Sequence, residues 1–438
     1  MKNRIFTILV ILVIASSSLF ASYNYPQLFY PETTFKPVSA RVEAMGGAGV
    51  AIASGNDAFF INPANLSSKK FSLNLPSVTV TLFNPLKILD SGLIEDLQDI
   101  GELNMEDPAG MLEFADRVSN VFGLDKGEVL TTDVALSFTA GGFGLGLQVQ
   151  EQLHSSNNHS DALSLKFMAE VNAALTVGYG YRFKIVPNVL SIDAGVNLRF
   201  TYKAYTSRLG VTEVANLLMQ GEGEGEGEGG EGGEVLETLL SSVKLAAGWA
   251  LPIDVGVNIN LPVGFTISAV ARDINGNYTM QNYPELGLWL NDLNAFIGLE
   301  TEYESDTVEV PTELIHKVPW KLDLGLGWAP SFGKLDKFFK PTIAVDLVDS
   351  VTMFEKLGDS ENYPNAFWDH FRAGAEIRLL SVLDLRGGFN RGYYSVGVGL
   401  DLFAIRVDAS YYWREFGAEI GDKPVDAFSV RVNLGFDR

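Results

Sequence analysis

A long run of strictly alternating residues is the feature that most constrains the fold of this chain. From Leu163 to Phe183 every odd-numbered residue is apolar, while the even-numbered residues include serine, lysine, glutamate and asparagine. Because 47% of the chain is apolar, eleven such residues in a row have a chance of roughly 1 in 4000 per window. Residues 243–261 alternate in the same way. The pattern predicts β-strands with one apolar and one polar face.

The length of these segments separates a membrane barrel from a soluble sandwich. Strands of soluble sheets average about 5 to 6 residues, whereas a tilted strand that crosses a bilayer needs about 9 to 11. Most alternating segments here reach that length. Trp320 and Trp328 end one such segment on the same parity, as aromatic residues at the two membrane interfaces do. The apolar faces are therefore expected to contact lipid, and the polar faces to line a lumen.

Fourteen segments fit this description, an even number as in bacterial barrels. They are residues 72–83, 130–141, 143–151, 163–184, 189–204, 243–261, 262–273, 319–329, 341–349, 368–379, 382–390, 393–402, 404–414 and 426–436. If both termini face the periplasm, the long connections 84–129, 205–242 and 274–318 are extracellular. Pro252 interrupts one segment and indicates a bulge, a kink that opens the wall, or two separate strands.

The N-terminus and the composition limit where the protein can be located and which chemistry it can carry out. Lys2 and Arg4 precede an apolar stretch that leads to small residues near Ala21, so residues 1–22 are predicted to be a cleaved signal peptide. The chain has no cysteine, which excludes disulfides and thiolate metal sites. A net charge of −22 disfavours binding to nucleic acid.

The segment before the first strand carries a family resemblance. It contains Met45-Gly46-Gly47-Ala48 and Asn62-Pro63-Ala64, and it resembles the N-terminal plug of the FadL-like outer-membrane family, which includes long-chain fatty-acid transporters and PorV-type proteins of one secretion system. Residues 270–275 and 344–349 also look like strand ends of that family. The resemblance implies an all-β fold: a transmembrane antiparallel β-barrel of about 14 strands spanning residues 71–438. Residues 23–70 would be a hatch inside its lumen.

Two functions of different classes follow. The leading hypothesis is an outer-membrane channel for diffusion-driven uptake of hydrophobic compounds, such as long-chain fatty acids or similar lipids. The alternative is a PorV-like, non-transporting barrel that binds exported proteins, and a general porin is disfavoured by the hatch. A long apolar cavity in the barrel would favour transport, whereas a filled lumen with a flat rim would favour partner binding. Outer-membrane lipids are expected partners, in a monomer or small homo-oligomer, with no cofactor and no enzymatic activity.

The candidate site residues fall into three groups. The hatch gate is expected at Asn62, Pro63 and Ala64. Helical spacing within residues 86–124 predicts amphipathic helices, whose apolar side chains would dock the substrate: Leu89, Leu93, Leu97, Leu112 and Phe122. The carboxylate of a substrate could pair with Arg199, Arg372 or Arg431, although ion pairs with lumen acids such as Asp193 and Glu376 are the commoner role for such arginines.

Two loops carry motifs with weaker signals. His154 and His159 are expected to share a polar loop and to bind no metal. Residues 221–234 contain six glutamates among glycines, a composition typical of a solvated loop.

Overall fold

The computed structural model describes residues 35, 39–68, 71–90, 110, 113, 116–117, 126–156, 165–187, 189–210, 239–298, 303–305, 310–359, 361, 363–417 and 420–437. The predicted signal peptide and the Gly and Glu segment 221–234 lie outside these residues, as do Leu93, Leu97, Leu112 and Phe122.

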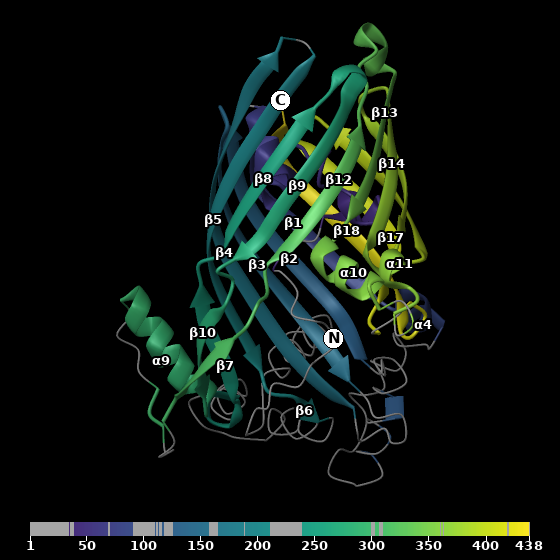
Figure 1. The fold of residues 1–438 in the computed structure, drawn as a ribbon. Coiled ribbons are helices and arrows are strands. Elements are labelled where there is room, and N and C mark those ends of the chain that lie inside the picture. The colour runs from purple at the N-terminus through teal and green to yellow at the C-terminus, as the bar shows by residue number, and fades with distance from the viewer. Residues whose placement is uncertain are drawn as a thin grey trace.

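The strands form one closed antiparallel sheet, the barrel of Figure 1. The first half contains β1 (Ser72–Phe83), β2 (Lys126–Ala140), β3 (Phe143–Ser156), β4 (Lys166–Val186), β5 (Leu190–Thr206), β6 (Leu209–Gly210), β7 (Leu245–Ala250), β8 (Ile253–Asn260) and β9 (Phe265–Ile274). The second half contains β10 (Tyr278–Tyr283), β11 (Thr312–His316), β12 (Lys321–Trp328), β13 (Phe339–Leu347), β14 (Phe371–Leu379), β15 (Leu383–Asn390), β16 (Tyr393–Leu402), β17 (Ile405–Glu415) and β18 (Pro424–Asp437). Val78 of β1 faces Val432 of β18 and Val134 of β2, which closes the ring.

Fourteen spanning strands make up the described sheet, as predicted. β7 with β8, β9 with β10, and β11 with β12 are each two parts of one strand, because both parts pair with the same neighbouring strands. β6 adds only two residues beside β4. The three strands are interrupted at residues 251–252, 275–277 and 317–320. Three neighbouring strands of the wall are thus broken where the other strands run on.

Pro252 marks a break within one strand. Leu198 faces Ile253 and Thr201 faces Ala250, so the register against β5 continues without a shift across residues 251 and 252. The register does shift on the other side, between β8 and β9. The segment is therefore one strand with a local irregularity, and the parity of the barrel is kept.

The two faces of the wall have the chemistry expected from the alternation. Outward residues such as Leu147, Leu175 and Val398 are exposed, while their neighbours Gln148 and Thr176 are buried in the lumen. Apolar side chains that face outward around the ring can be stable only in contact with lipid tails. The barrel is therefore a membrane-spanning one.

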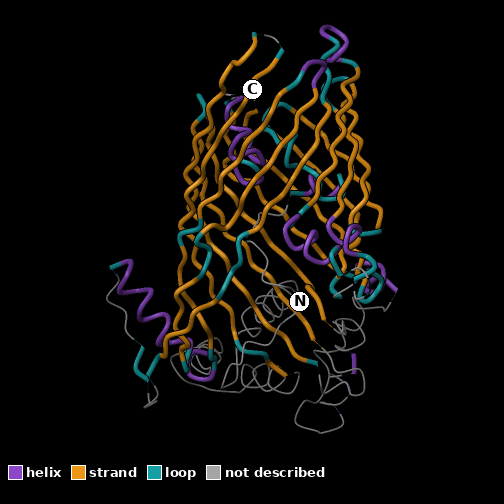
Figure 2. Tube along the Cα trace, in the orientation of Figure 1, coloured by secondary structure: helices purple, strands orange, loops and turns teal. Residues whose placement is uncertain are grey.

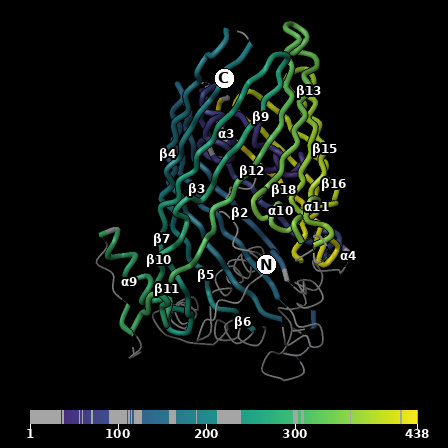
Figure 3. The backbone as a smooth tube through the Cα atoms, viewed as in Figure 1, coloured from purple at the N-terminus to yellow at the C-terminus, as the bar shows by residue number. Residues whose placement is uncertain are grey.

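The hatch lies inside the barrel. It consists of α2 (Ala40–Ala44), α3 (Asn56–Ile61) and η1 (Pro63–Ser68), drawn in purple within the strands in Figure 1, with α3 labelled in Figure 3. α2 packs on β15, β16 and β17, whereas η1 packs on β4, β5 and β8. The hatch therefore bridges opposite parts of the wall.

Helices gather at the end of the barrel that carries the long connections, the lower end in Figure 2. We call it the extracellular end, because barrels of this kind have short periplasmic turns. The helices there are α4 (Pro85–Asp90), α9 (Leu286–Ile297), α10 (Ser350–Leu357) and α11 (Ala366–His370). The periplasmic turns include η4 (Pro262–Gly264) and η5 (Gly333–Lys337). No helix among the described residues is long and apolar enough to cross a membrane.

The extracellular connections are more structured than the sequence indicated. β10, α9 and β11 occupy much of residues 274–318, which were expected to form one loop. β3 continues to Ser156 and thus includes His154, which was expected in a polar loop. The alternation weakens at these strand ends because they extend beyond the lipid, where an outward side chain need not be apolar.

Candidate functional site: the hatch and the lumen

Ion pairs between the hatch and the wall hold the hatch in place. Arg41 of α2 forms two hydrogen bonds of 2.8 Å with the Glu376 carboxylate of β14. On the other side, Arg431 of β18 donates to the Asp57 carboxylate of α3 at 2.9 Å. Asp346 of β13 accepts the backbone N–H groups of Gly49 and Val50 at 2.6 and 2.9 Å. Charge-assisted bonds of this type are strong in a buried site.

The predicted gate residues are packed against the wall. The Asn62 side chain is fully buried, and its amide donates to the Val50 carbonyl and to Asn258 of β8, at 3.0 and 2.9 Å. Its own oxygen accepts the Ala64 N–H at 3.0 Å. Pro63 and Ala64 approach β5 so closely that a Cβ at Gly195 would lie 2.5 Å from the Ala64 nitrogen. This geometry is that of an anchor, and a gating role stays a prediction.

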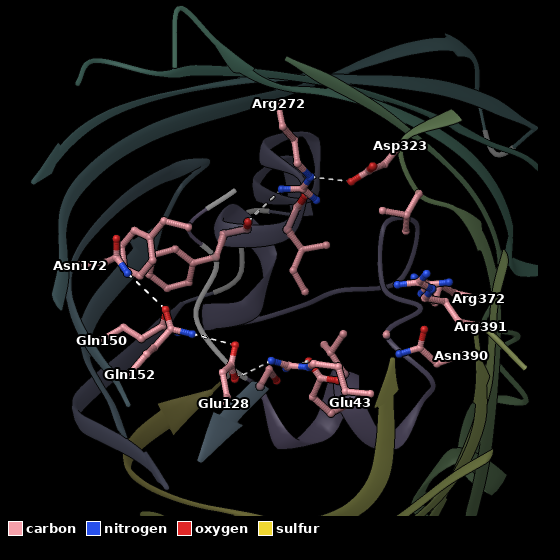
Figure 4. A pocket seen from close by; sticks show the side chains of 18 of the residues that line it. Glu43, Glu128, Gln150, Gln152, Asn172, Arg272, Asp323, Arg372, Asn390 and Arg391 are labelled. Atoms are coloured by element: carbon pink, nitrogen blue, oxygen red, sulfur yellow. Dashed lines mark hydrogen bonds and ion pairs between the residues drawn. The ribbon is translucent and has the colours of Figure 1, made fainter. Parts of the chain in front are cut away.

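A cavity of about 310 Å³ lies between the hatch and the extracellular end of the wall. We call it the lumenal cavity. Figure 4 shows Glu128, Gln152 and Asn172 on one side, Arg272 with Asp323 on a second, and Arg372, Arg391 and Asn390 on a third. The cavity is therefore lined largely by charged and amide side chains and is not the long apolar cavity named above as the mark of a transporter.

The three candidate arginines have different surroundings. Arg199 pairs with Asp254 at 2.9 Å and with Asp273, and Arg431 pairs with Asp57. These two arginines therefore form ion pairs with carboxylates of the protein itself. Arg372 is different: its guanidinium donates to the backbone carbonyls of Asp369 and Phe371, at 3.0 and 2.8 Å. The acids named in the sequence analysis have other partners, because Asp193 pairs with Arg182 and Glu376 with Arg41 and Arg386.

The predicted apolar dock is described only in part. Leu89 lies on α4 and is 71% exposed, and the other four members lie outside the described residues.

An apolar groove is present elsewhere, between α9 and the outer face of β2 to β7. It has a volume of about 250 Å³, and we call it the outer groove. Its residues are Leu130, Thr132, Glu151, Gln152, Leu153, Ala169, Glu170, Val171, Ala204, Thr206, Leu245, Leu286 and Trp289.

Helix α9 forms one side of the outer groove. Trp289 donates its indole N–H to the Tyr202 hydroxyl at 2.8 Å, and the Tyr283 hydroxyl donates to Asp292 at 2.8 Å. Leu286 and Trp289 pack on Ala204 and Leu245 of the wall. The sequence analysis missed this helix, although apolar residues recur at helical spacing within residues 286–297.

The inner face of the same wall is also apolar. Its residues form the lumenal apolar cluster: Met168, Tyr205, Ala246, Ala250, Tyr278, Met280 and Val318, with Leu314 packed against them. The His316 ring lies 5.9 Å from the Tyr205 ring and 5.7 Å from the Tyr278 ring. This cluster lies mainly on strands β4, β5, β7 and β10. Strand β7 ends at one strand break, and β10 begins directly after another. The lumenal face of this part of the wall thus carries an apolar cluster beside the Glu170–Lys203 ion pair, whereas the lumen over β14 to β17 is polar.

His370 is a titratable side chain of α11, outside the spanning strands at the extracellular end. His370 of α11 donates from Nδ1 to the Val348 carbonyl at 2.7 Å, which requires the proton on Nδ1. Burial lowers the pKa of His370, and the Val348 hydrogen bond and the Asp349 carboxylate oppose that shift. Within the described part of the chain, no cluster of three acidic or histidine side chains could hold a metal ion.

Comparisons with known proteins concern the fold. No family model and no curated protein matches the chain. Among solved structures, it is similar to the monoaromatic hydrocarbon channel CymD, with 13% identity, a TM-score of 0.44, and coverage of 92% of this chain and 98% of that one. The Pseudomonas putida toluene transporter TodX matches at 12% identity and TM-score 0.43, over 92% and 98% of the chains. A Pseudomonas aeruginosa FadL homologue matches at 10% and 0.41, over 91% and 98%.

The geometry of this chain defines its class. Fourteen antiparallel strands close into a ring with an apolar exterior, and an N-terminal hatch fills part of a polar lumen. This is the fold that the FadL-like resemblance implied, and it belongs to barrels of the outer membrane.

Proposed function

We propose that the protein is an outer-membrane channel for diffusion-driven uptake of hydrophobic compounds, with long-chain fatty acids or similar lipids as substrates. The observation that carries this proposal is an apolar cluster on the lumenal face of the wall that carries the outer groove. The outer groove lies on one face and the lumenal apolar cluster on the other. An apolar molecule that moves between such surfaces avoids the free-energy cost of entering water.

Two further features support passage at this stretch of wall. Gln152 and Glu170 line both the outer groove and the lumenal cavity, so only the wall separates the two spaces. The strand breaks at residues 251–252, 275–277 and 317–320 remove ladder hydrogen bonds that would have to open. The substrate would enter from the outer groove and leave sideways or past the hatch, without crossing the whole polar lumen.

Uptake into liposomes tests the proposal. Ala169 and Ala173 both face outward on β4, but only Ala169 lines the outer groove. Ala169→Phe is expected to fill the groove and to lower uptake of labelled decane, toluene and a long-chain fatty acid several-fold. Ala173→Phe is the matched control and is expected to leave uptake unchanged.

The same assay can contradict the proposal. If the unmodified protein raises uptake of none of these compounds above that of empty liposomes, the channel function is wrong. The alternative, a barrel that binds exported proteins, would then be favoured.

A further inference from the structure

Two of the five basic side chains that line the lumenal cavity lie together at one corner, beside Asn390. We call Arg372, Arg391 and Asn390 the arginine corner. Arg372 begins β14, and the other two lie at the β15–β16 turn. Both arginines contact Asp369, since Arg372 Nη1 donates to its backbone carbonyl at 3.0 Å and Arg391 Nη2 to its carboxylate at 3.2 Å. Figure 4 shows the two guanidinium groups close together at the edge of the cavity.

The charges at this corner do not balance. Asp369 provides one carboxylate for two guanidinium groups. Among the described residues Arg372 forms no ion pair, since the acceptors of its hydrogen bonds are backbone carbonyls. In addition, the buried Nε of Arg391 and the buried Oδ1 of Asn390 have no hydrogen-bond partner in the described part of the chain. A buried donor without a partner is costly, so the Arg391 Nε–H favours a ligand that supplies an acceptor, whereas the Asn390 oxygen would need a donor.

The other carboxylates of the cavity already have partners. Asp323 pairs with Arg272 at 2.7 Å and Glu128 with Arg414 at 2.8 Å. Glu170 pairs with Lys203. Glu43 lies 3.8 Å from Arg414, and Glu415 accepts from the Tyr393 hydroxyl and from three backbone N–H groups. The excess positive charge therefore stays at the arginine corner.

The backbone at Arg391 is also unusual. Its φ is +47° and that of Gly392 is +89°, the left-handed pair that a two-residue hairpin turn requires and that favours Asn-Gly. An arginine at the first of these positions is uncommon. The turn therefore accepts an unfavourable residue at the point where its side chain reaches the cavity.

We propose that the arginine corner is an anion-binding site that takes the carboxylate head of an amphiphilic substrate in the lumenal cavity. The planar guanidinium of Arg372 can donate two parallel hydrogen bonds to a carboxylate, and Arg391 Nε provides a further donor. Val50, Phe60 and Ile61 of the same cavity provide apolar contacts for the beginning of an alkyl tail. The inference rests on the proposed function and adds a headgroup preference to it.

Binding of octanoate and octan-1-ol to the full-length protein in nanodiscs tests the site. The two probes have the same chain length, so the difference between them reports the head. We expect octanoate to bind at least about tenfold more tightly than octan-1-ol, a ratio that corresponds to one good charge-assisted interaction. Arg372→Gln should remove most of this difference, and Arg372→Lys should keep part of it. The dissociation constant of octan-1-ol should change less than about twofold.

Two further variants keep the test interpretable. Arg391→Asn removes the second charge and suits the left-handed turn, so it should fold even if Arg372→Gln does not, and it should also weaken octanoate binding. Arg182→Gln is the control, because Arg182 pairs with Asp193 outside the cavity, and it should bind both probes as the unmodified protein does.

Several results would overturn the inference. They are equal binding of octanoate and octan-1-ol by the unmodified protein, no effect of Arg372→Gln or Arg391→Asn on octanoate, or displacement of octanoate by an equal concentration of inorganic phosphate, which would indicate a site for free anions. Failure of the proposed channel function would look different, because neither octanoate nor octan-1-ol would then enter liposomes faster with the protein than without it.

Discussion

At the scale of single residues, close approach of backbones explains the small residues of the hatch. Gly46 has a φ of +67°, and a Cβ there would lie 2.5 Å from the Phe389 nitrogen and 2.7 Å from the Ala373 oxygen. The glycine is required both by its left-handed conformation and by the β14 and β15 backbones beside it. The Met-Gly-Gly-Ala motif therefore has a structural cause in this protein.

Gly46→Ala is expected to loosen the hatch. The left-handed conformation alone costs about 1 to 2 kcal/mol with a side chain, and the contacts with Phe389 and Ala373 add to this. Because the chain has no cysteine, the thiol of an Ala53→Cys background can report exposure of the hatch to a reactive dye in urea. Gly333→Ala is the control, since Gly333 has a φ of +65° with nothing near its Cβ. Equal dye reactivity in the two variants would contradict the explanation.

Replacement of Arg386 would measure how much the buried charge network of the wall contributes to stability. Its fully buried side chain contacts three carboxylates, those of Glu376, Asp384 and Asp408, at 2.6, 2.9 and 2.8 Å. Arg386→Gln removes the one guanidinium that contacts all three carboxylates, each of which keeps at least one other arginine partner. Breaking a buried ion pair costs about 3 to 5 kcal/mol. Urea unfolding in detergent micelles measures the loss.

The control for this experiment is again Arg182→Gln. The Arg182 side chain is 39% exposed and pairs with the buried Asp193, which also accepts a hydrogen bond from Asn260 at 2.8 Å, so the loss of Arg182 should cost less than the loss of Arg386. Comparable losses in the two variants would show that the network contributes no special stability.

At the scale of elements, the extracellular helices are attached to the barrel by few polar contacts. α10 and α11 pack on each other, and the Val348 N–H donates to the His370 carbonyl at 2.9 Å while His370 Nδ1 donates to the Val348 carbonyl at 2.7 Å. His370 Nε2 is buried without a partner among the described residues. A proton on Nε2 would therefore be unfavourable in the folded protein.

We expect α10 and α11 to loosen as the pH falls. Because burial lowers the pKa of folded His370 below its ordinary value of 6.5, the unfolded segment takes up the proton first. The stabilisation is complete above about pH 6.5 and is lost below it. Hydrogen exchange of residues 350–370, corrected for the intrinsic rate, should be several-fold faster at pH 5.5 than at pH 7.5. His370→Asn keeps a donor that does not titrate and should abolish this dependence, and an unchanged dependence would contradict the assignment to His370.

At the scale of the whole molecule, the hatch closes a barrel whose wall is already complete. Contacts from α2 and η1 reach opposite sides of the ring, and the closed sheet depends on none of the hatch residues for its own pairing. The barrel is therefore expected to form without the hatch, and the lumen to conduct ions only in its absence.

Deletion of residues 39–68 tests this arrangement. In planar bilayers the full-length protein should carry little current, while the deletion variant should form open pores with a conductance many-fold higher. The β content of both proteins in detergent, measured by circular dichroism, is the control for assembly. Equal conductance would mean that the hatch does not close the lumen.

Local sequence patterns predicted much of the fold. The outward and lumenal faces, the fourteen spanning strands and the position of the hatch followed from alternation, segment length and the quoted motifs. The surroundings of the candidate residues could not be predicted in the same way: Arg199 and Arg431 lie in internal ion pairs, and the outer groove, α9 and the arginine corner were not anticipated. Arg391 could have been suspected, because Asn-Arg-Gly is an unusual sequence for a tight turn.

The sequence by itself determined which side of each strand meets lipid, because the two-residue period of a strand is a local property and the bilayer imposes the same solvent on every outward side chain. Only the tertiary structure decided which lumen charges pair with each other. Arg41 and Glu376 are 335 residues apart in the chain, and their meeting depends on closure of the ring and on the depth of the hatch. For the same reason, the absence of an ion pair at Arg372 among the described residues could be recognised only from the partners of the neighbouring lumen carboxylates.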